Sequence, residues 1–404
     1  MEEVDGEGEG DEYQHVQQFI TDSPWAALNL MTTVATRTSA LYARQLTSQE
    51  QEVGSSIDES AHLKKGTQSV GVAGQDAGVL GKVDTCQVGV DARLGWQTHT
   101  RLINTRLFLP DCWTEDEARG EQAGIPEATR GHQTKPQLAF EMLHAEMKAG
   151  VRFGWGGGDG LYGHGYDLSS AVDDLGLTFL FDVHGDQLVY LEQPVLAVPE
   201  KQPGRGRTPT LPRPDAHAIP GQADQAGLGD ADWHAVDGRD TAKGVFTLAL
   251  QVKEVWVWEG REHPARRGTL VISRNEAESK LKYSRSNADA ATTPLERFAY
   301  MQAQRYWVER SFQDAKSEFG MSDDQVRKWQ GGHHHRALVL LAMSCMVRER
   351  LLNQQVYPLL RCRDVRMLMI AVLTEDRQLV DKRLDQMRNR HKQRQQDIQR
   401  HFKT

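Results

Sequence analysis

The stretch RYWVERSFQDAKSEFG, residues 305–320, says most about the fold of this chain. At about 100° per residue, Arg305, Glu309, Phe312 and Lys316 fall on one narrow face of a helix. A neighbouring stripe of apolar residues would bury that helix against a core. The stripe consists of Met301, Val308, Phe312, Ala315 and Phe319. The pattern predicts a helix that holds a carboxylate beside two cations, although an ordinary amphipathic helix with i, i+4 charge pairs would look the same.

Two further carboxylates stand upstream, each where a strand is expected to end. Asp58 follows a short run in GSSIDES, ahead of the strand-like segments TQSVGVAG and KVDTCQVGV. Asp159 ends an apolar stretch and enters the glycine-rich turn of RFGWGGGDGLYG. For each carboxylate taken alone, a solvated or helix-capping role is the ordinary interpretation.

The order of these residues resembles a known family. Asp, Asp and Glu in this order, with the Glu on a later helix, resemble the DDE transposases of bacterial insertion sequences. The spacing Arg305-x3-Glu309-x6-Lys316 is similar to the end of one subgroup's signature, Tyr-x2-Arg-x3-Glu-x6-Lys. Other phrases resemble the same subgroup from about residue 14 to the C-terminus, namely KKGxxSVGV, LGKVDxCQVGV, RLFLP…CW, TKPQLAFEML, GDxxYG and RHKQRQ.

The resemblance implies an α/β fold with an RNase H-like mixed sheet flanked by helices. A strand-rich insertion would precede the last catalytic helix, and a helical extension would follow it. The resemblance also implies that Asp58, Asp159 and Glu309 are the catalytic residues and hold two Mg²⁺ ions, for which Mn²⁺ can substitute. Carboxylate oxygens are ligands that suit such hard cations. Two metal ions suit in-line displacement at phosphorus, so the implied activity is DNA strand cleavage and strand transfer.

By the same resemblance, the DNA-binding residues are Arg305, Arg310 and Lys316. The expected partners are the transposon ends, the target DNA and a second copy in a synaptic homodimer. The chain departs from the signature at Gln302, where the subgroup has Tyr, and an acidic tail replaces the usual N-terminal region, so the chain looks N-terminally truncated. Three functions stay open: a transposase, a truncated DNA-binding relative that inhibits transposition, and a metal-dependent nuclease on the same core. An intact carboxylate triad favours the two enzymes.

Charge is unevenly distributed along the chain. The net charge is −8, yet residues 261–404 hold 28 Lys and Arg against 17 Asp and Glu, a net of +11, which leaves −19 for the preceding 260 residues. A basic region that carries Glu309 fits a DNA-binding surface, and it also fits an ordinary solvated one. The apolar run 336–347 is too short to span a bilayer, and the four dispersed cysteines indicate reduced thiols. With no recognisable signal peptide, we expect a cytoplasmic protein that does not contact membranes.

Composition and periodicity divide the chain into six expected regions. These are a disordered acidic tail (1–13), a remnant N-terminal helical region (14–52), the first part of the RNase H-like core (53–186), a strand-rich insertion with a Pro/Gly-rich loop (187–293), the catalytic Glu helix with a packing helix (294–355) and a basic C-terminal helical extension (356–404). Helices are expected to begin at Ser23-Pro24 and after Gly331-Gly332. The histidines that follow these glycines, His333 to His335, are a weaker candidate for a metal site, because consecutive side chains on a helix point in different directions.

Overall fold

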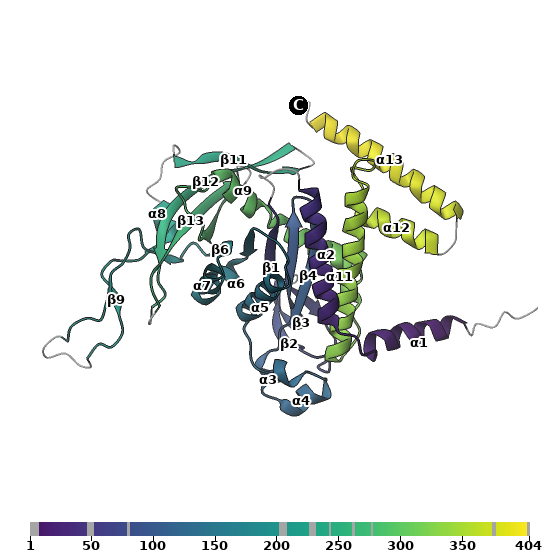
Figure 1. Ribbon diagram of the computed structural model, residues 1–404, viewed down its shortest axis with the longest axis horizontal. Helices are drawn as coiled ribbons and strands as arrows, with labels where there is room; N and C mark the ends of the chain where they lie inside the picture. Colours follow the sequence, from purple (N-terminus) through teal and green to yellow (C-terminus); the bar gives the residue numbers. More distant parts are fainter. Residues whose placement is uncertain are drawn as a thin grey trace, which may run out of the picture. The chain divides into compact units, whose positions relative to one another are not determined.

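The computed structural model describes residues 8–46, 52–78, 81–201, 208–225, 232–241, 244–260, 263–275, 278–373 and 377–401. The chain forms two compact units. The first contains residues 1–52, 58–152 and 307–396, and the second contains residues 53–57, 153–306 and 397–404. Strand β1, Gly54–Leu63, contributes residues to both units (Figure 1).

The first unit is a small sheet covered by helices. Its remaining strands are β2 (Ala73–Ala77), β3 (Lys82–Trp96) and β4 (His99–Leu107). Its helices are α1 (Gly8–Thr21), α2 (Ala27–Gln45), α3 (Asp111–Thr114), α4 (Glu117–Gln122), η1 (Glu127–Thr129), α5 (Lys135–Lys148), α10 (Tyr306–Glu318, from residue 307 on), η3 (Met321–Asp323), α11 (Trp329–Leu352), α12 (Cys362–Leu373) and most of α13 (Arg377–His401). Strand β3 pairs with β1, β2 and β4, and the pairings with β2 and β4 are antiparallel.

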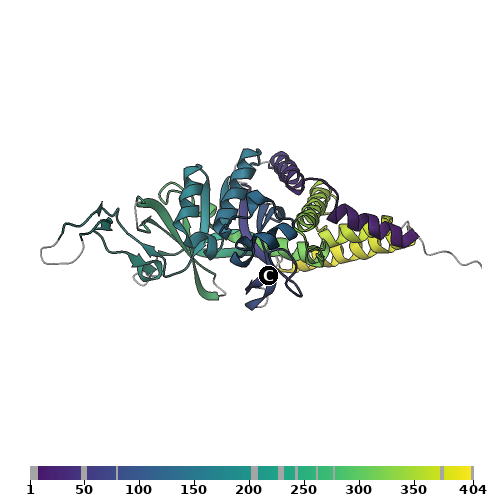
Figure 2. The same ribbon diagram turned by 90° about the horizontal axis from the view of Figure 1, so that it is seen from below.

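Helices α2 and α11 lie side by side and both contact β4 (Figures 1 and 2). Their shared core includes Met31 of α2, Leu102 of β4 and Leu340 of α11, each at most 1% exposed. Burying side chains of this size stabilises the fold by roughly 1.5–3 kcal/mol each. Helix α5 begins with a capping box in which Thr134 and Gln137 satisfy each other's backbone N–H groups. This helix is followed by Gly150, whose φ of 84° is typical of a residue that ends a helix.

The second unit contains the other part of the sheet. Its strands are residues 54–57 of β1, β5 (Trp155–Gly158), β6 (Thr178–Val183), β7 (Leu188–Val189), β8 (Leu196–Ala197), β9 (Arg213–Pro214), β10 (Ile219–Pro220), β11 (His234–Thr241), β12 (Gly244–Val257), β13 (Arg266–Asn275) and β14 (Glu278–Ser286). Its helices are α6 (Gly160–His164), α7 (Tyr166–Asp174), α8 (Gly221–Gln225) and α9 (Leu295–Ala303). The main strand order is β11-β12-β13-β14-β6-β5-β1.

This sheet is mixed. Strand β5 runs parallel to both β1 and β6, whereas β11 to β14 form an antiparallel meander that joins the sheet through β6. Helices α6 and α7 contact β6, and α9 contacts β6, β11 and β12. The mixed α/β sheet flanked by helices confirms the predicted RNase H-like fold class. The strands predicted between residues 233 and 286 are present as β11 to β14.

The predicted single helix from Met301 to Phe319 is wrong. Helix α9 ends at Ala303 and α10 begins at Tyr306, so Arg305 lies in a turn between two helices. The predicted apolar stripe is divided between two cores. Met301 packs with Phe298 in the second unit, whereas Val308 packs with other apolar residues of the first unit. A single straight helix could not serve two cores, because its apolar stripe faces one direction.

Three other boundaries differ from the sequence expectation. Strand β1 continues five residues beyond Asp58. In this part Ser60 and His62 are buried, Ser60 donates a hydrogen bond to Asp91 of β3, and His62 hydrogen-bonds to Ser60 on the same strand. Helix α11 begins at Trp329, and Gly331 lies inside it, where a Cβ would meet the side chain of Val326 at 3.3 Å. Helix α2 begins at Ala27 rather than at Ser23-Pro24. Residues 1–7 of the predicted acidic tail lie outside the described residues, and α1 begins at Gly8.

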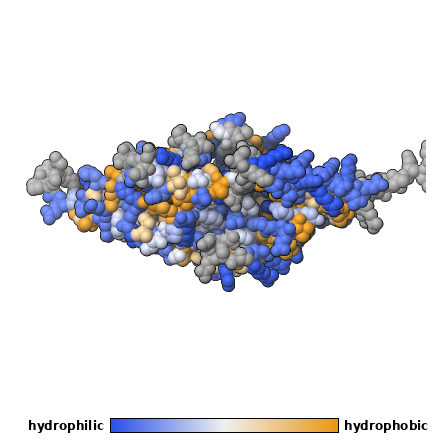
Figure 3. Space-filling view, turned by 90° about the horizontal axis from the view of Figure 1, so that it is seen from above, coloured by the Kyte–Doolittle hydropathy of each residue, from blue (hydrophilic) through white to orange (hydrophobic). Residues whose placement is uncertain are grey.

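Most side chains on the face drawn in Figure 3 are hydrophilic. Hydrophobic side chains form separate patches among hydrophilic ones on the face drawn in Figure 3. Within the described part of the chain, every helix is too short or too polar to cross a bilayer. All four cysteines are free thiols.

Candidate active site

An aspartate directly follows each of three residues that pair across neighbouring parallel strands. Ile57 of β1 lies opposite Gly158 of β5, and Gly158 lies opposite Phe181 of β6. The next residues along these strands are Asp58, Asp159 and Asp182. Neighbouring strands are about 4.8 Å apart. Within the second unit, the register of β5 against β6 therefore relates the predicted Asp159 to Asp182, an acid that was not predicted.

Asp159 is fixed at the start of a helix. It is the N-cap of α6, and its Oδ1 accepts a hydrogen bond from the backbone N–H of Leu161 at 3.0 Å. Helix α6 then packs tightly against β6, because a Cβ on Gly163 would lie 1.9 Å from the carbonyl oxygen of Asp182. A side chain at position 163 would push α6 away from the sheet, so this glycine is required for the placement of Asp159.

Asp182 is the centre of a polar network in the second unit. Its Oδ2 lies 2.8 Å from Nη1 of Arg305, and its Oδ1 accepts a hydrogen bond from Ser284 Oγ at 2.8 Å. Ser284 Oγ in turn accepts a hydrogen bond from Nε2 of Gln302 at 3.1 Å. Gln302, which stands where the subgroup signature has Tyr, belongs to this network and is 7% exposed. The acid at the end of the apolar run TFLFDV is the sequence signal that could have indicated Asp182.

Glu309 lies on α10, which belongs to the first unit together with Asp58. Its side chain is exposed, whereas Val308 and Ala315 on the same helix are buried as predicted and Phe319 is only partly buried. Phe312, expected on the charged face, is itself buried at 7% exposure. Asp58 is 9% exposed, and its Oδ1 accepts a hydrogen bond from the backbone N–H of Glu59.

The predicted DNA-binding cations differ in their surroundings. Arg305 is paired with Asp182, and Arg310 pairs with Asp314 one turn along α10 at 3.0 Å. Lys316 is half-buried over the ring of Phe312 and forms no ion pair among the described residues. Burial lowers the pKa of Lys316, and the negative charges of Asp91 and then Glu309 oppose that shift.

A buried acid of β3 lies behind this helix. Asp91 is 1% exposed, accepts a hydrogen bond from Ser60 at 3.1 Å, and has no partner for its Oδ1 among the described residues. Burial raises the pKa of Asp91, and the guanidinium of Arg336 opposes the shift. Arg336 fits against β3 only because residue 89 is glycine, since a Cβ there would lie 2.9 Å from its Nη1. The sequence alone gave no indication of Asp91, because it stands inside a strand of ordinary composition.

Donor chemistry fits a divalent metal ion at the predicted carboxylates. Asp58, Asp159 and Glu309 supply only oxygen ligands, which Mg²⁺ and Mn²⁺ prefer. Oδ2 of Asp159 has no hydrogen-bond partner among the described residues. In the part of the chain that the structure describes, no group of three or more His, Cys, Asp or Glu side chains is arranged to hold a metal ion.

The three consecutive histidines form hydrogen bonds with backbone carbonyl groups. Their ring nitrogens contact carbonyl oxygens: His333 that of Trp329, His334 those of Ile20 and Trp25, and His335 that of Gly320. Because these contacts point in different directions along α11, the histidines do not converge on one point.

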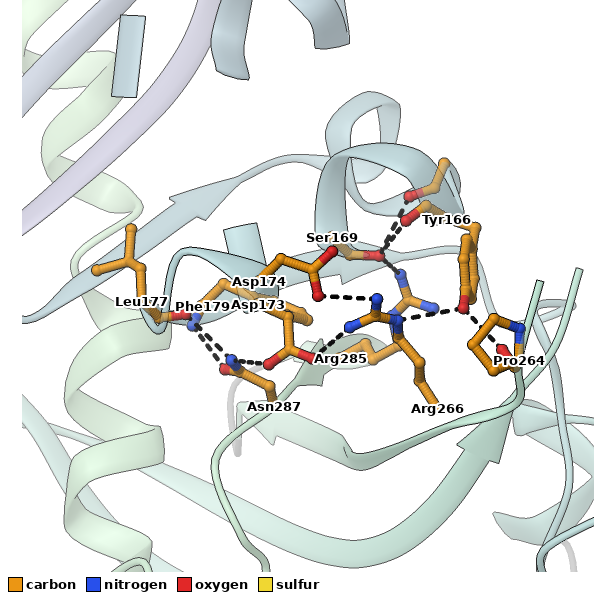
Figure 4. Close-up of polar contacts among 11 residues, drawn as sticks. Tyr166, Ser169, Asp173, Asp174, Leu177, Phe179, Pro264, Arg266, Arg285 and Asn287 are labelled. Atoms are coloured by element: carbon orange, nitrogen blue, oxygen red, sulfur yellow. Dashed lines mark hydrogen bonds and ion pairs between the residues drawn. The ribbon is translucent and has the colours of Figure 1, made fainter. Parts of the chain in front are cut away.

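A second polar cluster ties the meander to α7 in the second unit (Figure 4). Arg266 of β13 reaches Asp173 and Asp174, each at 2.9 Å, and its Nε donates to the hydroxyl of Tyr166 at 3.2 Å. Asn287 donates to the other oxygen of Asp173 at 2.7 Å. Each of these side chains uses its polar atoms on neighbouring elements, so we interpret the cluster as a structural connection between β13 and α7.

Comparison with known proteins identifies a family. A protein-family model described as DDE superfamily endonuclease matches residues 2–245, which is more than half of the chain and includes Asp58 and Asp159. No curated protein matches the chain.

Proposed function

The chain belongs to the DDE superfamily endonucleases, which indicates metal-dependent cleavage of DNA, and from this premise we propose that it is a transposase. In this proposal the enzyme nicks DNA strands at the ends of an insertion sequence and joins the freed 3′ ends to target DNA. The observation that supports the proposal is the register of β1 against β5, in which Ile57 pairs with Gly158, the residues that directly precede Asp58 and Asp159 in the sequence. The third proposed member is Glu309, the acid of the Arg-x3-Glu-x6-Lys spacing on α10.

Asp58, Asp159 and Glu309 are the residues that would hold two Mg²⁺ ions. Such a pair of ions activates the attacking water or 3′-hydroxyl and stabilises the leaving oxygen. The protein itself sets the orientation of the ligands. The hydrogen bond from Leu161 fixes one oxygen of Asp159 and leaves the other for a ligand. The hydrogen bond from the backbone N–H of Glu59 orients the carboxylate of Asp58.

Lys316 is the cation that we propose for contact with a DNA phosphate. Arg305 forms an ion pair with Asp182, and Arg310 forms one with Asp314. A DNA phosphate would therefore have to compete with a carboxylate for each guanidinium group. The basic helix α13 supplies further positive charge, and a second copy of the chain would complete a synaptic complex. Contacts of this kind bind DNA without regard to sequence and weaken as salt is added.

The test uses the full chain with DNA that contains the flanks of its own gene. We expect nicking at the element ends in Mg²⁺ or Mn²⁺, and loss of nicking with retained DNA binding in Glu309→Gln, Asp58→Asn and Asp159→Asn. Glu318→Gln on the same helix is the control and should cleave normally, because Glu318 pairs with Arg366 rather than with the proposed ligands.

Strand transfer separates a transposase from a plain nuclease. A supercoiled target plasmid should acquire the nicked end in the wild type. Cleavage without any joining would favour the nuclease, and end binding without cleavage in Mn²⁺ would favour the inhibitor. Cleavage that survives Glu309→Gln would refute the assignment of Glu309.

A further inference from the structure

The first unit contains a cavity of about 490 Å³ that the proposed chemistry does not use. It is lined by the start of α2, by β4, by α5 and by the start of α11. Its volume lies within the roughly 300–1,000 Å³ of small-molecule sites in proteins. Most of the exposed lining is apolar, and its charged side chains are Arg106 and Glu141. A mainly apolar lining with placed polar groups is typical of sites that bind organic ligands.

Two indoles form part of the cavity wall, and an imidazole supports each of them. Trp25 stacks on His334, with ring centroids 3.8 Å apart and planes at 11°, and Trp329 lies against His333 at 4.1 Å. His334 is itself held by the carbonyl oxygens of Ile20 and Trp25 at 2.8 and 2.7 Å. Rigid aromatic side chains in a cavity favour a flat ring system as the ligand, because stacking costs them little conformational entropy.

The start of two long helices borders the same cavity. Residues Ala26 to Asn29 begin α2, and Trp329 and Gln330 begin α11, helices of 19 and 24 residues. Neither N-cap residue, Ala26 or Lys328, supplies a side-chain cap. The first amide groups of a helix carry partial positive charge and bind anions when they are not capped.

Arg106 of β4 adds a full positive charge to this wall. Its Nη1 donates to Oδ1 of Asn104 at 2.6 Å and to the carbonyl of Thr105 at 2.9 Å, which fixes the guanidinium. Burial lowers the pKa of Arg106, but an arginine remains charged at neutral pH. A guanidinium held in this way is suited to bind a phosphate or a carboxylate.

His333 adds an acceptor to the same cavity. It is 7% exposed, and its Nδ1 lies 2.9 Å from the carbonyl of Trp329, so this nitrogen carries the ring proton. Burial lowers the pKa of His333 to about 3, so the ring is neutral at physiological pH. Its Nε2 is therefore a lone-pair acceptor, and it has no hydrogen-bond partner among the described residues. A ligand with both an N–H donor and an anionic group would satisfy the acceptor and the cations together.

We propose that this cavity binds a single nucleotide, with its base beside Trp25 and Trp329 and its phosphate toward Arg106 and the helix starts. A nucleobase provides the flat ring and the N–H donor, and the phosphate provides the anion. An inorganic anion would not contact the indole rings, and an apolar ligand would not use Nε2 of His333 or the charge of Arg106. The nucleotide comes either from the end of a DNA strand or from free solution.

Calorimetry on the full chain tests the proposal with the four deoxynucleoside monophosphates, with a nucleoside and with inorganic phosphate. We expect at least one nucleotide to bind in the micromolar to millimolar range, at least tenfold more tightly than either the nucleoside or phosphate. Trp329→Leu should weaken nucleotide binding at least tenfold, and Arg106→Gln should remove the preference for nucleotide over nucleoside. The control Trp258→Leu removes a half-buried indole outside the cavity and should leave binding unchanged.

The wild-type measurement decides the proposal even if a variant fails to fold, which circular dichroism would reveal. The absence of binding for all four nucleotides up to several millimolar would overturn it, as would inorganic phosphate binding as tightly as the best nucleotide. An unchanged affinity in folded Trp329→Leu would also overturn it. A single-stranded oligonucleotide distinguishes the two sources: it displaces the mononucleotide if the site receives a strand end, and it fails to do so if the site takes free nucleotide.

Discussion

The guanidinium of Arg305 lies 2.8 Å from the carboxylate of Asp182, and this ion pair connects the turn before α10 to strand β6. The two side chains are 29% and 24% exposed, so water screens the pair only in part. Ser284 and Gln302 extend the contact to β14 and α9. The pair therefore fixes the chain just before the helix that carries Glu309.

The first prediction concerns the strength of this ion pair. A double-mutant cycle of Arg305→Ala and Asp182→Asn should give a coupling free energy of about 1 kcal/mol in chemical unfolding. The control cycle uses Arg388 and Asp385 of α13, which form an ion pair at 3.4 Å but are 62% and 70% exposed. That pair should show coupling near zero. Equal coupling in both cycles would mean that the Asp182 pair has no special structural role.

The second prediction concerns the close packing of α6 on β6. Gly163→Ala should destabilise the protein by about 1–3 kcal/mol, because the new methyl group would overlap the carbonyl of Asp182. DNA cleavage should fall as well, since α6 begins at Asp159. Gly165→Ala is the matched control: nothing lies within 4 Å of its Cβ, and its φ of −82° suits alanine. The prediction fails if the two variants unfold at the same denaturant concentration.

The sequence predicted the fold class and much of the element order, and its errors have physical causes. Periodicity identified the apolar residues around Glu309, but it could not show that Met301 and Val308 pack in different cores, which is why the break at Arg305 was missed. Asp58 and Asp159 could be selected from motifs. Asp182 was not selected although it ends the apolar run TFLFDV, because its relation to Asp159 depends on strand register, which becomes visible only when β5 and β6 are paired. The effect of Arg336 on the buried Asp91 likewise depends on the packing of α11 against β3, which the sequence does not show.

The third prediction tests Lys316 as a phosphate contact. Lys316→Ala should weaken DNA binding and reduce the slope of log affinity against log salt by about 0.9, the release of one counterion. Arg305→Ala should change the slope less, because its guanidinium is held by Asp182. Filter binding at four salt concentrations measures both slopes. Lys82→Ala, an exposed lysine paired with Asp84, is the control for a simple loss of charge. If Lys316→Ala behaves like this control, Lys316 has a structural role beside Phe312 and Asp91.

The last prediction is a pH dependence of stability that comes from His99 of β4. This side chain is 5% exposed, and burial together with the charge of Arg350 lowers its pKa from 6.5 to about 4. The unfolded chain therefore binds a proton at higher pH than the folded chain does. The contribution of His99 is fully present above pH 6.5 and is lost as the pH falls from 6.5 to 4, by about 3 kcal/mol in total.

Unfolding by urea at pH 7.5, 6, 5 and 4.5 measures this loss. His99→Gln cannot take up a proton in this range, so its unfolding free energy should fall less steeply with pH than that of the wild type. His132→Gln is the control, because His132 is exposed and pairs with Asp111 at the surface, and its pH profile should follow the wild type. Parallel profiles for the wild type and His99→Gln would show that His99 is protonated as easily in the folded protein as in the unfolded one. The burial of the His99 ring would then not be the cause of the fall in unfolding free energy at low pH.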